Sequence, residues 1–185
     1  MSWDKEINEI LKKKEFALQQ GGKENVERQH SKGLLTIRER ITLILDDNTF
    51  EEIGPGAGGA ERDKNGGLIK FNPANFVLGF GKINGRDCVI GGEDFTVKGG
   101  SPTEAGLRKS IYIEDLAIQN LVPLVRLHQG GGGSVTGASG NTQVSTSPVY
   151  NPPRFKTVAQ TLQAIPVATA ALGAVAGLPA ARLVA

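Results

Sequence analysis

The sequence predicts an α/β fold, in which buried parallel strands alternate with helices. Residues 121–128 form a short apolar run that is followed, after Gln129, by the glycines at 130–133. A second apolar run, residues 165–172, stops at the small pair Gly173-Ala174. Apolar runs of this length that end in glycine are typical of buried strands. A helical pattern precedes the first run, and a strand, a helix and a strand in that order favour a right-handed crossover.

The composition is ordinary for a globular protein. With 185 residues, the chain is long enough for one domain or for one domain and an extension. We expect a helical extension with a linker over residues 1–33 and the domain over residues 34–185. Hydrophobic residues make up 39% of the chain and charged residues 22%. The formal net charge of +2 is too small to indicate a nucleic-acid partner or an anionic membrane.

A single cysteine, Cys88, excludes an internal disulfide framework and a cysteine-based zinc site. The amino end shows no signal-peptide or transit-peptide pattern, which favours the cytoplasm or a matrix-like compartment. Residues 165–185 are apolar, but Pro166, Pro179 and Arg182 interrupt them, so a buried strand and helix explain them better than a membrane span. The sequence stops inside this helical pattern without a C-cap signal, and we interpret it as a cut chain.

The extension is expected to begin with an amphipathic helix over residues 3–20. One face of this helix is apolar and carries Trp3, Ile7, Ile10, Leu11 and Leu18. Two interpretations of that face stay open: it makes a subunit contact, or the helix packs on its own domain. Residues 24–33 are polar and are expected to form the linker.

Two strong local signals mark the first half of the domain. The segment Thr36-Ile37-Arg38-Glu39 is a capping box that starts a second helix, which is expected to end near residue 46. Asn84-Gly85 predicts a type I′ turn, and therefore a hairpin of residues 76–83 and 86–90 that continues to about residue 95. Cys88 alternates with apolar neighbours there and is expected in the core. Residues 50–53 are expected to form a strand, and residues 54–73 a surface loop.

The second half is expected to alternate helices and strands. Ser101-Pro102-Thr103-Glu104 combines a capping box with proline at the first helical position, and predicts a helix to about residue 120. Residues 130–147 are low in complexity and cannot form a core of their own, so they are either disordered or an adaptable active-site loop. Pro152-Pro153 should open a helix to about residue 163, and a further helix is expected from Gly173 onward.

The two glycine-rich strand ends are the strongest candidates for a functional site. Glycine lacks a Cβ, so its amide can approach a ligand closely. Two strand ends with exposed N–H groups suggest a pair of donors for a developing oxyanion, and the helix expected after Gly173 would add its positive end. His128 could serve as a general base at the first strand end, although a lone histidine is more often packed or solvent-facing.

Two segments resemble the amino-terminal half of biotin-dependent carboxyltransferases. They are Gly79-Phe80-Gly81-Lys82-Ile83-Asn84-Gly85-Arg86 and Glu93-Asp94-Phe95-Thr96-Val97-Lys98-Gly99-Gly100-Ser101. These enzymes are the β subunits of acyl-CoA carboxylases of the propionyl-CoA and methylcrotonyl-CoA type. Residues 33–41 are similar to the helical lead-in of that family, and the resemblance extends to Pro179. It implies a crotonase-like fold, a spiral of ββα turns, with residues 34–185 as an incomplete amino-terminal domain.

The resemblance also implies an activity, in which a carboxyl group moves from carboxybiotin to an acyl-CoA through an enolate. The implied partners are the acyl-CoA, a biotin carboxylase or biotin carrier subunit, the carboxyl-terminal carboxyltransferase domain and further copies of the chain. No metal, nucleic acid or membrane is implied. The implied oxyanion donors are Gly132, Gly133, Gly173 and Ala174. The candidate CoA contacts are Arg38, Lys98, Gly99, Gly100 and Gly131. For Arg38, a place on an exposed helix face is the more common explanation.

The sequence departs from this family in two places. The family usually has aspartate or asparagine, serine, two glycines, alanine and arginine after the central strand, whereas residues 129–134 read Gln-Gly-Gly-Gly-Gly-Ser. The carboxyl-terminal domain, with the expected oxyanion site for biotin, is also missing. Two alternatives stay open. One is another crotonase-like acyl-CoA enzyme, a decarboxylase or hydratase that would use Glu93, Asp94 or Glu104, and the other is a non-catalytic fragment that acts in subunit assembly.

Overall fold

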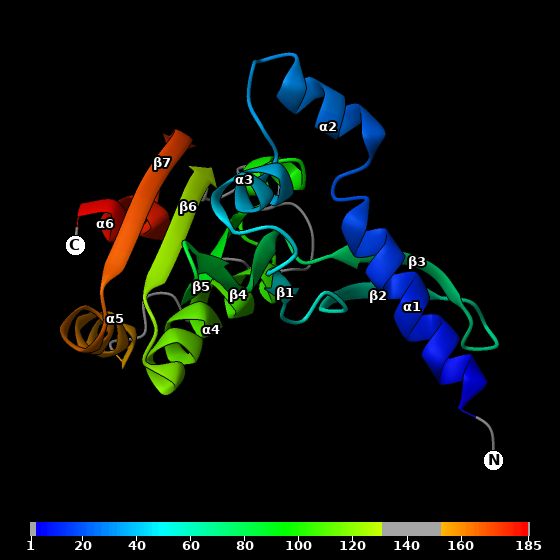
Figure 1. The fold of residues 1–185 in the computed structure, drawn as a ribbon. Coiled ribbons are helices and arrows are strands. Elements are labelled where there is room, and N and C mark those ends of the chain that lie inside the picture. The colour runs from blue at the N-terminus through cyan, green and yellow to red at the C-terminus, as the bar shows by residue number, and fades with distance from the viewer. Residues whose placement is uncertain (1–2, 131–152, 185) are drawn as a thin grey trace.

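A computed structural model describes residues 3–130 and 153–184 of the chain (Figure 1). Its main layer is a five-stranded sheet with the strand order β1-β4-β5-β6-β7, and β2 and β3 form a separate two-stranded sheet. The strands are β1 (Glu51–Glu52), β2 (Gly58–Arg62), β3 (Leu68–Pro73), β4 (Phe76–Ile83), β5 (Arg86–Glu93), β6 (Leu124–Gly130) and β7 (Val167–Val175). The helices are α1 (Asp4–Leu18), α2 (Lys23–His30), α3 (Ile37–Ile44), the short 3-10 helix η1 (Lys98–Gly100), α4 (Glu104–Asn120), α5 (Pro153–Ala164) and α6 (Leu178–Val184).

The main sheet is mixed. β4 and β5 form an antiparallel hairpin, while β5, β6 and β7 run parallel to one another. The helix α4 connects β5 to β6, as expected for a crossover between parallel strands. Asn84 and Gly85 both have positive φ angles, 51° and 76°, which confirms the predicted type I′ turn.

Helices cover both faces of the main sheet. On one face, Ile113 and Ala117 of α4 belong to a buried cluster with Leu78 of β4. On the other face, Ile37 of α3 belongs to a second cluster that includes Cys88 of β5, as predicted for that cysteine. The two clusters take alternate residues of β4 and β5, because successive side chains of a strand point to opposite faces.

The two predicted capping boxes have different outcomes. The box at Thr36 is present, since its side chain accepts from the Glu39 amide and Glu39 accepts from the Thr36 amide. The box at Ser101 is wrong, because α4 begins at Glu104 and its N-cap is Thr103, whose hydroxyl accepts from the Gly106 amide. Asn75 holds Thr103 at the N-cap position, because its side-chain oxygen accepts from both the backbone amide and the hydroxyl of Thr103.

Two segments expected to be irregular are regular. The predicted linker, residues 24–33, contains most of α2, and the predicted loop, residues 54–73, contains the β2–β3 hairpin. Most side chains of both elements are exposed, so neither sequence shows the apolar periodicity on which the prediction relied. Each is held instead by one buried residue, Gln29 in α2 and Phe71 in β3.

The last strand is longer than predicted. We expected a strand over residues 165–172 and a helix from Gly173, but β7 continues to Val175 and α6 begins at Leu178. Gly130 pairs with Val175, and its carbonyl accepts from the Ala176 amide at 3.0 Å. This pairing keeps the chain extended beyond Gly173, so the predicted helix start is wrong.

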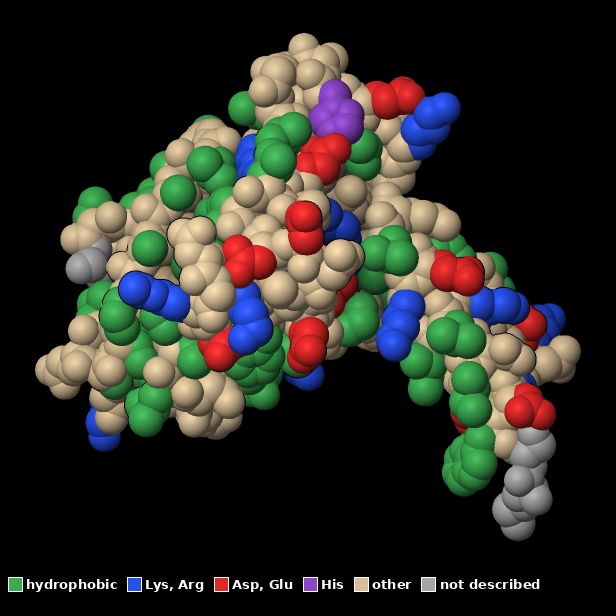
Figure 2. Space-filling view, viewed as in Figure 1, with side chains coloured by type: hydrophobic (Ala, Val, Ile, Leu, Met, Phe, Trp, Pro, Cys, Tyr) green, Lys and Arg blue, Asp and Glu red, His purple; other side chains and the backbone are tan. Residues whose placement is uncertain are grey.

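The apolar face of α1 is exposed. The exposed fractions of its five side chains run from 49% at Leu11 to 70% at Trp3. Figure 2 shows hydrophobic side chains along the arm that α1 forms beside the β2–β3 hairpin. This face therefore does not pack on the chain's own domain, which was one of the two open interpretations. Among the described residues, no helix is both long and apolar enough to cross a membrane.

Candidate functional site

The carboxyl ends of β5 and β6 meet the predicted CoA-contacting run at η1. A Cβ atom on Gly100 would lie 2.7 Å from the Gln129 carbonyl oxygen and 3.3 Å from the Gly130 Cα, so only glycine permits this approach. Gly99, Gly100 and Gly130 all have positive φ angles, which glycine adopts without strain. The structure thus brings Lys98, Gly99 and Gly100 to the start of the glycine run. Gly131, Gly132 and Gly133 lie outside the described residues.

Gly173 and Ala174 lie in an irregular stretch of β7 beside the same place. The strand pairing passes from His128–Ala171 directly to Gly130–Val175, so residues 172–174 of β7 oppose the single residue Gln129 of β6. Gly173 lies against the Gln129 side chain, where a Cβ would be 3.0 Å from its Cγ. Gly173 and Ala174 are therefore close to the end of β6, but they do not begin a helix, and the expected positive helix end lies at Leu178 instead.

A buried polar cluster supports these strand ends. His128 is 1% exposed, and its Nδ1 lies 3.0 and 3.1 Å from the two carboxylate oxygens of Glu93. The Gln129 amide donates to the same carboxylate at 3.3 Å. The histidine is thus a packed residue that ties β6 to β5, in agreement with the more common of the two roles considered for it.

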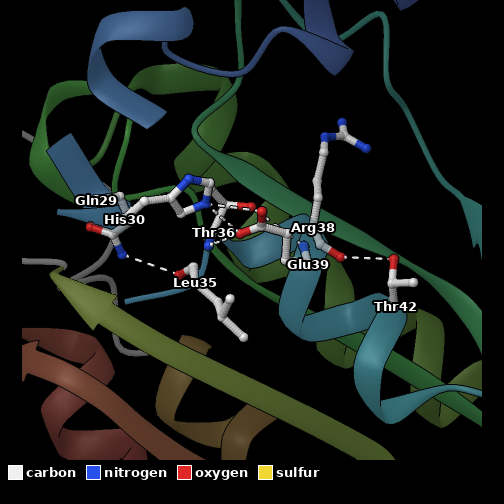
Figure 3. A network of polar contacts seen from close by, with 7 residues as sticks. All are labelled: Gln29, His30, Leu35, Thr36, Arg38, Glu39 and Thr42. Atoms are coloured by element: carbon white, nitrogen blue, oxygen red, sulfur yellow. Dashed lines mark hydrogen bonds and ion pairs between the residues drawn. The ribbon is translucent and has the colours of Figure 1, made fainter. Parts of the chain in front are cut away.

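Arg38 is engaged in an ion pair. Its guanidinium makes two hydrogen bonds to Glu52, of 2.9 and 3.0 Å, and its side chain is 17% exposed. The Lys109 ammonium approaches the same carboxylate at 3.8 Å. Figure 3 shows the Arg38 side chain directed away from the His30–Glu39 pair, while its carbonyl accepts from the Thr42 hydroxyl. The alternative expectation for Arg38, an exposed helix face, is therefore wrong.

A recess of about 1170 Å³ opens beside η1. Its walls are the corner between α1 and α2, the β2–β3 hairpin, η1 and the first turns of α4. The lining combines cations, amides and aromatic rings, among them Lys70, Lys98, Arg108, Lys109, Gln20, Asn25, Asn72, Phe16, Phe71 and Tyr112. Of the residues predicted to contact CoA, Arg38, Lys98, Gly99 and Gly100 lie in the part of the chain that the structure describes, and among these four only Lys98 lines this recess.

One pattern in the sequence could have indicated residues of this recess. Arg108, Lys109 and Tyr112 lie three and four positions apart, the spacing that places residues on one face of a helix. Burial lowers the pKa of Lys109 to about 8, an effect that the nearby Glu52 carboxylate partly opposes. The Lys109 ammonium also donates to the Gly54 carbonyl at 3.2 Å, so it links α4 to the segment before the hairpin.

The turn between α1 and α2 is hydrogen-bonded to the segment before η1 at Gly21. The Gly21 amide donates to the Thr96 hydroxyl at 2.9 Å, and the Thr96 amide and hydroxyl both donate to Asp94, at 3.0 and 2.5 Å. Burial raises the pKa of Asp94, and the hydrogen bonds from Thr96 oppose that rise. Within residues 3–130 and 153–184, no group of three or more histidine, cysteine, aspartate or glutamate side chains is placed to hold a metal ion.

The family model for the carboxyl transferase domain matches residues 28–180. The chain belongs to the carboxyl transferase family. It is 38% identical over 131 residues to the propionyl-CoA carboxylase beta chain of Cereibacter sphaeroides, a match that covers 70% of this chain and 25% of that one. It is also 38% identical over 136 residues to the mitochondrial propionyl-CoA carboxylase beta chain of Homo sapiens, with 70% and 24% covered. The chain thus spans about a quarter of the length of the curated family members it matches.

Solved structures of the carboxyl transferase family have the same fold. A transcarboxylase 12S structure, described as a hexamer with methylmalonyl-coenzyme A and methylmalonic acid bound, superimposes with a TM-score of 0.70 at 23% identity, covering 99% of this chain and 34% of that one. A single-chain, multi-domain long-chain acyl-CoA carboxylase superimposes with a TM-score of 0.72 at 24% identity, covering 96% and 18%. The fold is crotonase-like and of the α/β class, as the sequence resemblance implied.

Proposed function

We propose that this chain forms the acyl-CoA side of a biotin-dependent acyl-CoA carboxyltransferase, where it binds the CoA thioester and stabilises its enolate. Membership of the carboxyl transferase family supports the reaction class. The observation that carries the proposal is the meeting of three segments at one sheet edge: Lys98–Gly100, the end of β6, and the irregular stretch of β7.

The chemistry requires N–H donors for the oxygen of the enolate thioester. In the proposal, one donor comes from the turn at Gly132 and Gly133, and the other from Gly173 or Ala174. Each backbone donor aimed at a developing oxyanion contributes roughly 3–4 kcal/mol to catalysis. Because residues 172–174 oppose a single residue of β6, the irregular pairing around Gly173 favours it as the source of a spare amide.

The recess beside η1 suits the nucleotide end of CoA. Its lysines and arginine complement phosphate charge, and its aromatic rings and amides suit a purine base. Lys98, Gly99, Gly100 and Gly131 would then contact CoA between the recess and the strand ends. Arg38 is a weaker candidate, because it would have to leave Glu52 to reach a phosphate.

The three carboxylates that a decarboxylase or hydratase would use are already engaged. Glu93 holds His128 and the Gln129 amide, Asp94 holds Thr96, and Glu104 pairs with Arg108 at 2.5 Å. This favours a carboxyltransferase, in which carboxybiotin acts as the co-substrate and supplies the carboxyl group. The proton lost from the α-carbon would pass to the biotin that gives up the carboxyl group, so the chain's own residues bind the thioester and hold its oxygen without a protein base.

The proposed partners would supply what this chain's own residues do not, namely the carboxybiotin and the domain that holds it. They are a biotin carboxylase or biotin carrier subunit, a carboxyl-terminal carboxyltransferase domain that holds the biotin, and further copies of the chain in an oligomer, in the cytoplasm or a matrix-like compartment. The exposed apolar face of α1 supports a role in such an assembly. Transcarboxylase 12S, which assembles as a hexamer, has this fold.

Calorimetric titration of the 185-residue chain with propionyl-CoA tests the proposal. We expect saturable binding that weakens roughly 10–150-fold in Lys98→Met, since a phosphate contact contributes about 1.5–3 kcal/mol. Lys64→Met is the matched control, because Lys64 is exposed in the turn between β2 and β3 and does not line the recess. Absence of saturable binding, or equal affinity in the two variants, would contradict the assignment.

A further inference from the structure

Gln129 is the residue on which four segments converge. Its side chain is 3% exposed, and it is the last residue before the glycine run. Its backbone N–H donates to the Glu93 carboxylate at the end of β5, and its backbone carbonyl lies against Gly100 of η1. Its side chain lies against Gly173 of β7. The fourth contact comes from Gln29 of α2, which is 100 positions away in the sequence.

The side-chain amides of the two glutamines are paired, and Gln129 Nε2 also donates back to Gln29 Oε1 at 3.5 Å. Gln29 is also 3% exposed, and its Nε2 donates to the Leu35 carbonyl at 3.2 Å and to the Gln129 Oε1 at 2.8 Å. A backbone carbonyl can only accept, so the amide nitrogen of Gln29 must face Leu35, and its second hydrogen then selects the oxygen of Gln129. A buried side-chain amide that loses its hydrogen-bond partner lowers the stability of the fold, so this bond holds the Gln129 side chain in one orientation.

That orientation determines the path of β7 beside it. The space at Gly173 is already tight, because a Cβ there would lie 3.0–3.2 Å from three atoms of the Gln129 side chain. The Gln129 side chain therefore fills the space beside the Gly173 Cα, and a different conformer would remove this support from residues 172–174, which have no one-to-one partners on β6. Leu172 is also held by Arg40, whose guanidinium donates to its carbonyl at 3.2 Å.

We propose that Gln29 and Gln129 are positioning residues for the oxyanion donor on β7, so that helix α2 controls recognition of the thioester carbonyl through one side-chain pair. This inference rests on the proposed function, in which Gly173 or Ala174 faces the thioester oxygen. Neither glutamine contacts the substrate. Gln29 acts on Gln129, and Gln129 acts on the backbone at Gly173.

A pair of ligands isolates this effect. Propionyl-CoA carries the thioester carbonyl, and S-propyl-CoA is the thioether that lacks it but keeps the rest of the molecule. We expect the 185-residue chain to bind the thioester roughly tenfold more tightly than the thioether, which corresponds to two hydrogen bonds of ordinary strength. In Gln29→Met the ratio should fall below about threefold, while the affinity for the thioether stays unchanged.

Three further variants separate positioning from stability. Gln129→Met removes the same bond from the other side and should lower the ratio to the same extent, with no further loss in the double variant. Gln119→Met is the matched control on an exposed position of α4. Thr161→Val removes a buried hydroxyl in α5 that donates to the Thr157 carbonyl, so it should lower the melting temperature and keep the ratio. The infrared carbonyl band of the bound thioester should move toward its free position in both glutamine variants only.

The outcomes are distinguishable. If the wild-type chain discriminates and Gln29→Met still does, the positioning role is overturned and the proposed function stands. If the wild-type chain binds both ligands equally, no donor of this chain reaches the carbonyl, and the inference falls while CoA binding stands. If the wild-type chain binds neither ligand, the proposed function fails, and the inference fails with it.

Discussion

Gly21→Ala should displace the amino-terminal helices at the recess and weaken CoA binding. A Cβ on Gly21 would lie 2.0 Å from the carbonyl oxygen of Thr96 and 2.5 Å from its carbonyl carbon. Both are backbone atoms, so no side-chain rotation can relieve the contact. The chain must therefore move at Gly21, and the hydrogen bond from its amide to the Thr96 hydroxyl is lost with that movement.

The cost follows from these two contacts. Overpacking of a tight site costs about 1–3 kcal/mol, and the lost hydrogen bond adds about 1 kcal/mol. Because Phe16 of α1, Gln20 of the turn and Asn25 of α2 line the recess, the displacement alters one of its walls. If the whole cost of about 2–4 kcal/mol falls on the binding-competent arrangement, the affinity for CoA drops by roughly 30–700-fold.

Gly59→Ala provides a matched control for this experiment. Gly59 lines the same recess from β2, its φ is not positive, and an added Cβ there meets nothing within 4 Å. Titration calorimetry with propionyl-CoA measures the affinity, and limited proteolysis reports whether α1 has become accessible. The reasoning is refuted if Gly21→Ala binds propionyl-CoA as tightly as Gly59→Ala does.

Three other predictions follow from the structure. Since burial lowers the pKa of Lys109 to about 8 from 10.5, the unfolded chain binds more protons between those pH values, so the unfolding free energy should rise by about 3 kcal/mol from pH 8 to 10.5. Denaturant titrations should show that Lys109→Met lacks this rise, and an equal rise in both proteins would exclude Lys109 as its source. Glu114 is fully buried and pairs with the guanidinium groups of Arg126 and Arg182. Glu114→Gln leaves both cations without a countercharge, costs about 3–5 kcal/mol and should lower the melting temperature by roughly 6–20 °C; an unchanged melting temperature argues against this. In an assembled carboxyltransferase, Gly173→Pro removes a backbone donor and should abolish carboxylation, whereas Ala174→Ser keeps the N–H and should retain more activity. Loss of activity only in step with melting would show that the effect is structural.

Local signals in the sequence determined several elements of this protein. The Asn84-Gly85 turn, the capping box at Thr36 and the buried position of Cys88 each depend on residues close together in the chain. Such signals predict a hairpin, a helix start and a core residue because the interactions that stabilise them are formed within a few positions. The apolar runs that end in glycine likewise predict the two parallel strands, although the predicted ends of these strands differ from those in the structure.

The tertiary structure alone decided where β7 ends and what surrounds the candidate site. β7 extends past Gly173 because Gly130 pairs with Val175, and no pattern within residues 165–175 reports a partner on another strand. The recess is formed by elements that are far apart in the sequence, and Gln29 meets Gln129 across 100 positions. A hydrogen bond between two buried amides needs both partners in place, and only the folded chain brings them together.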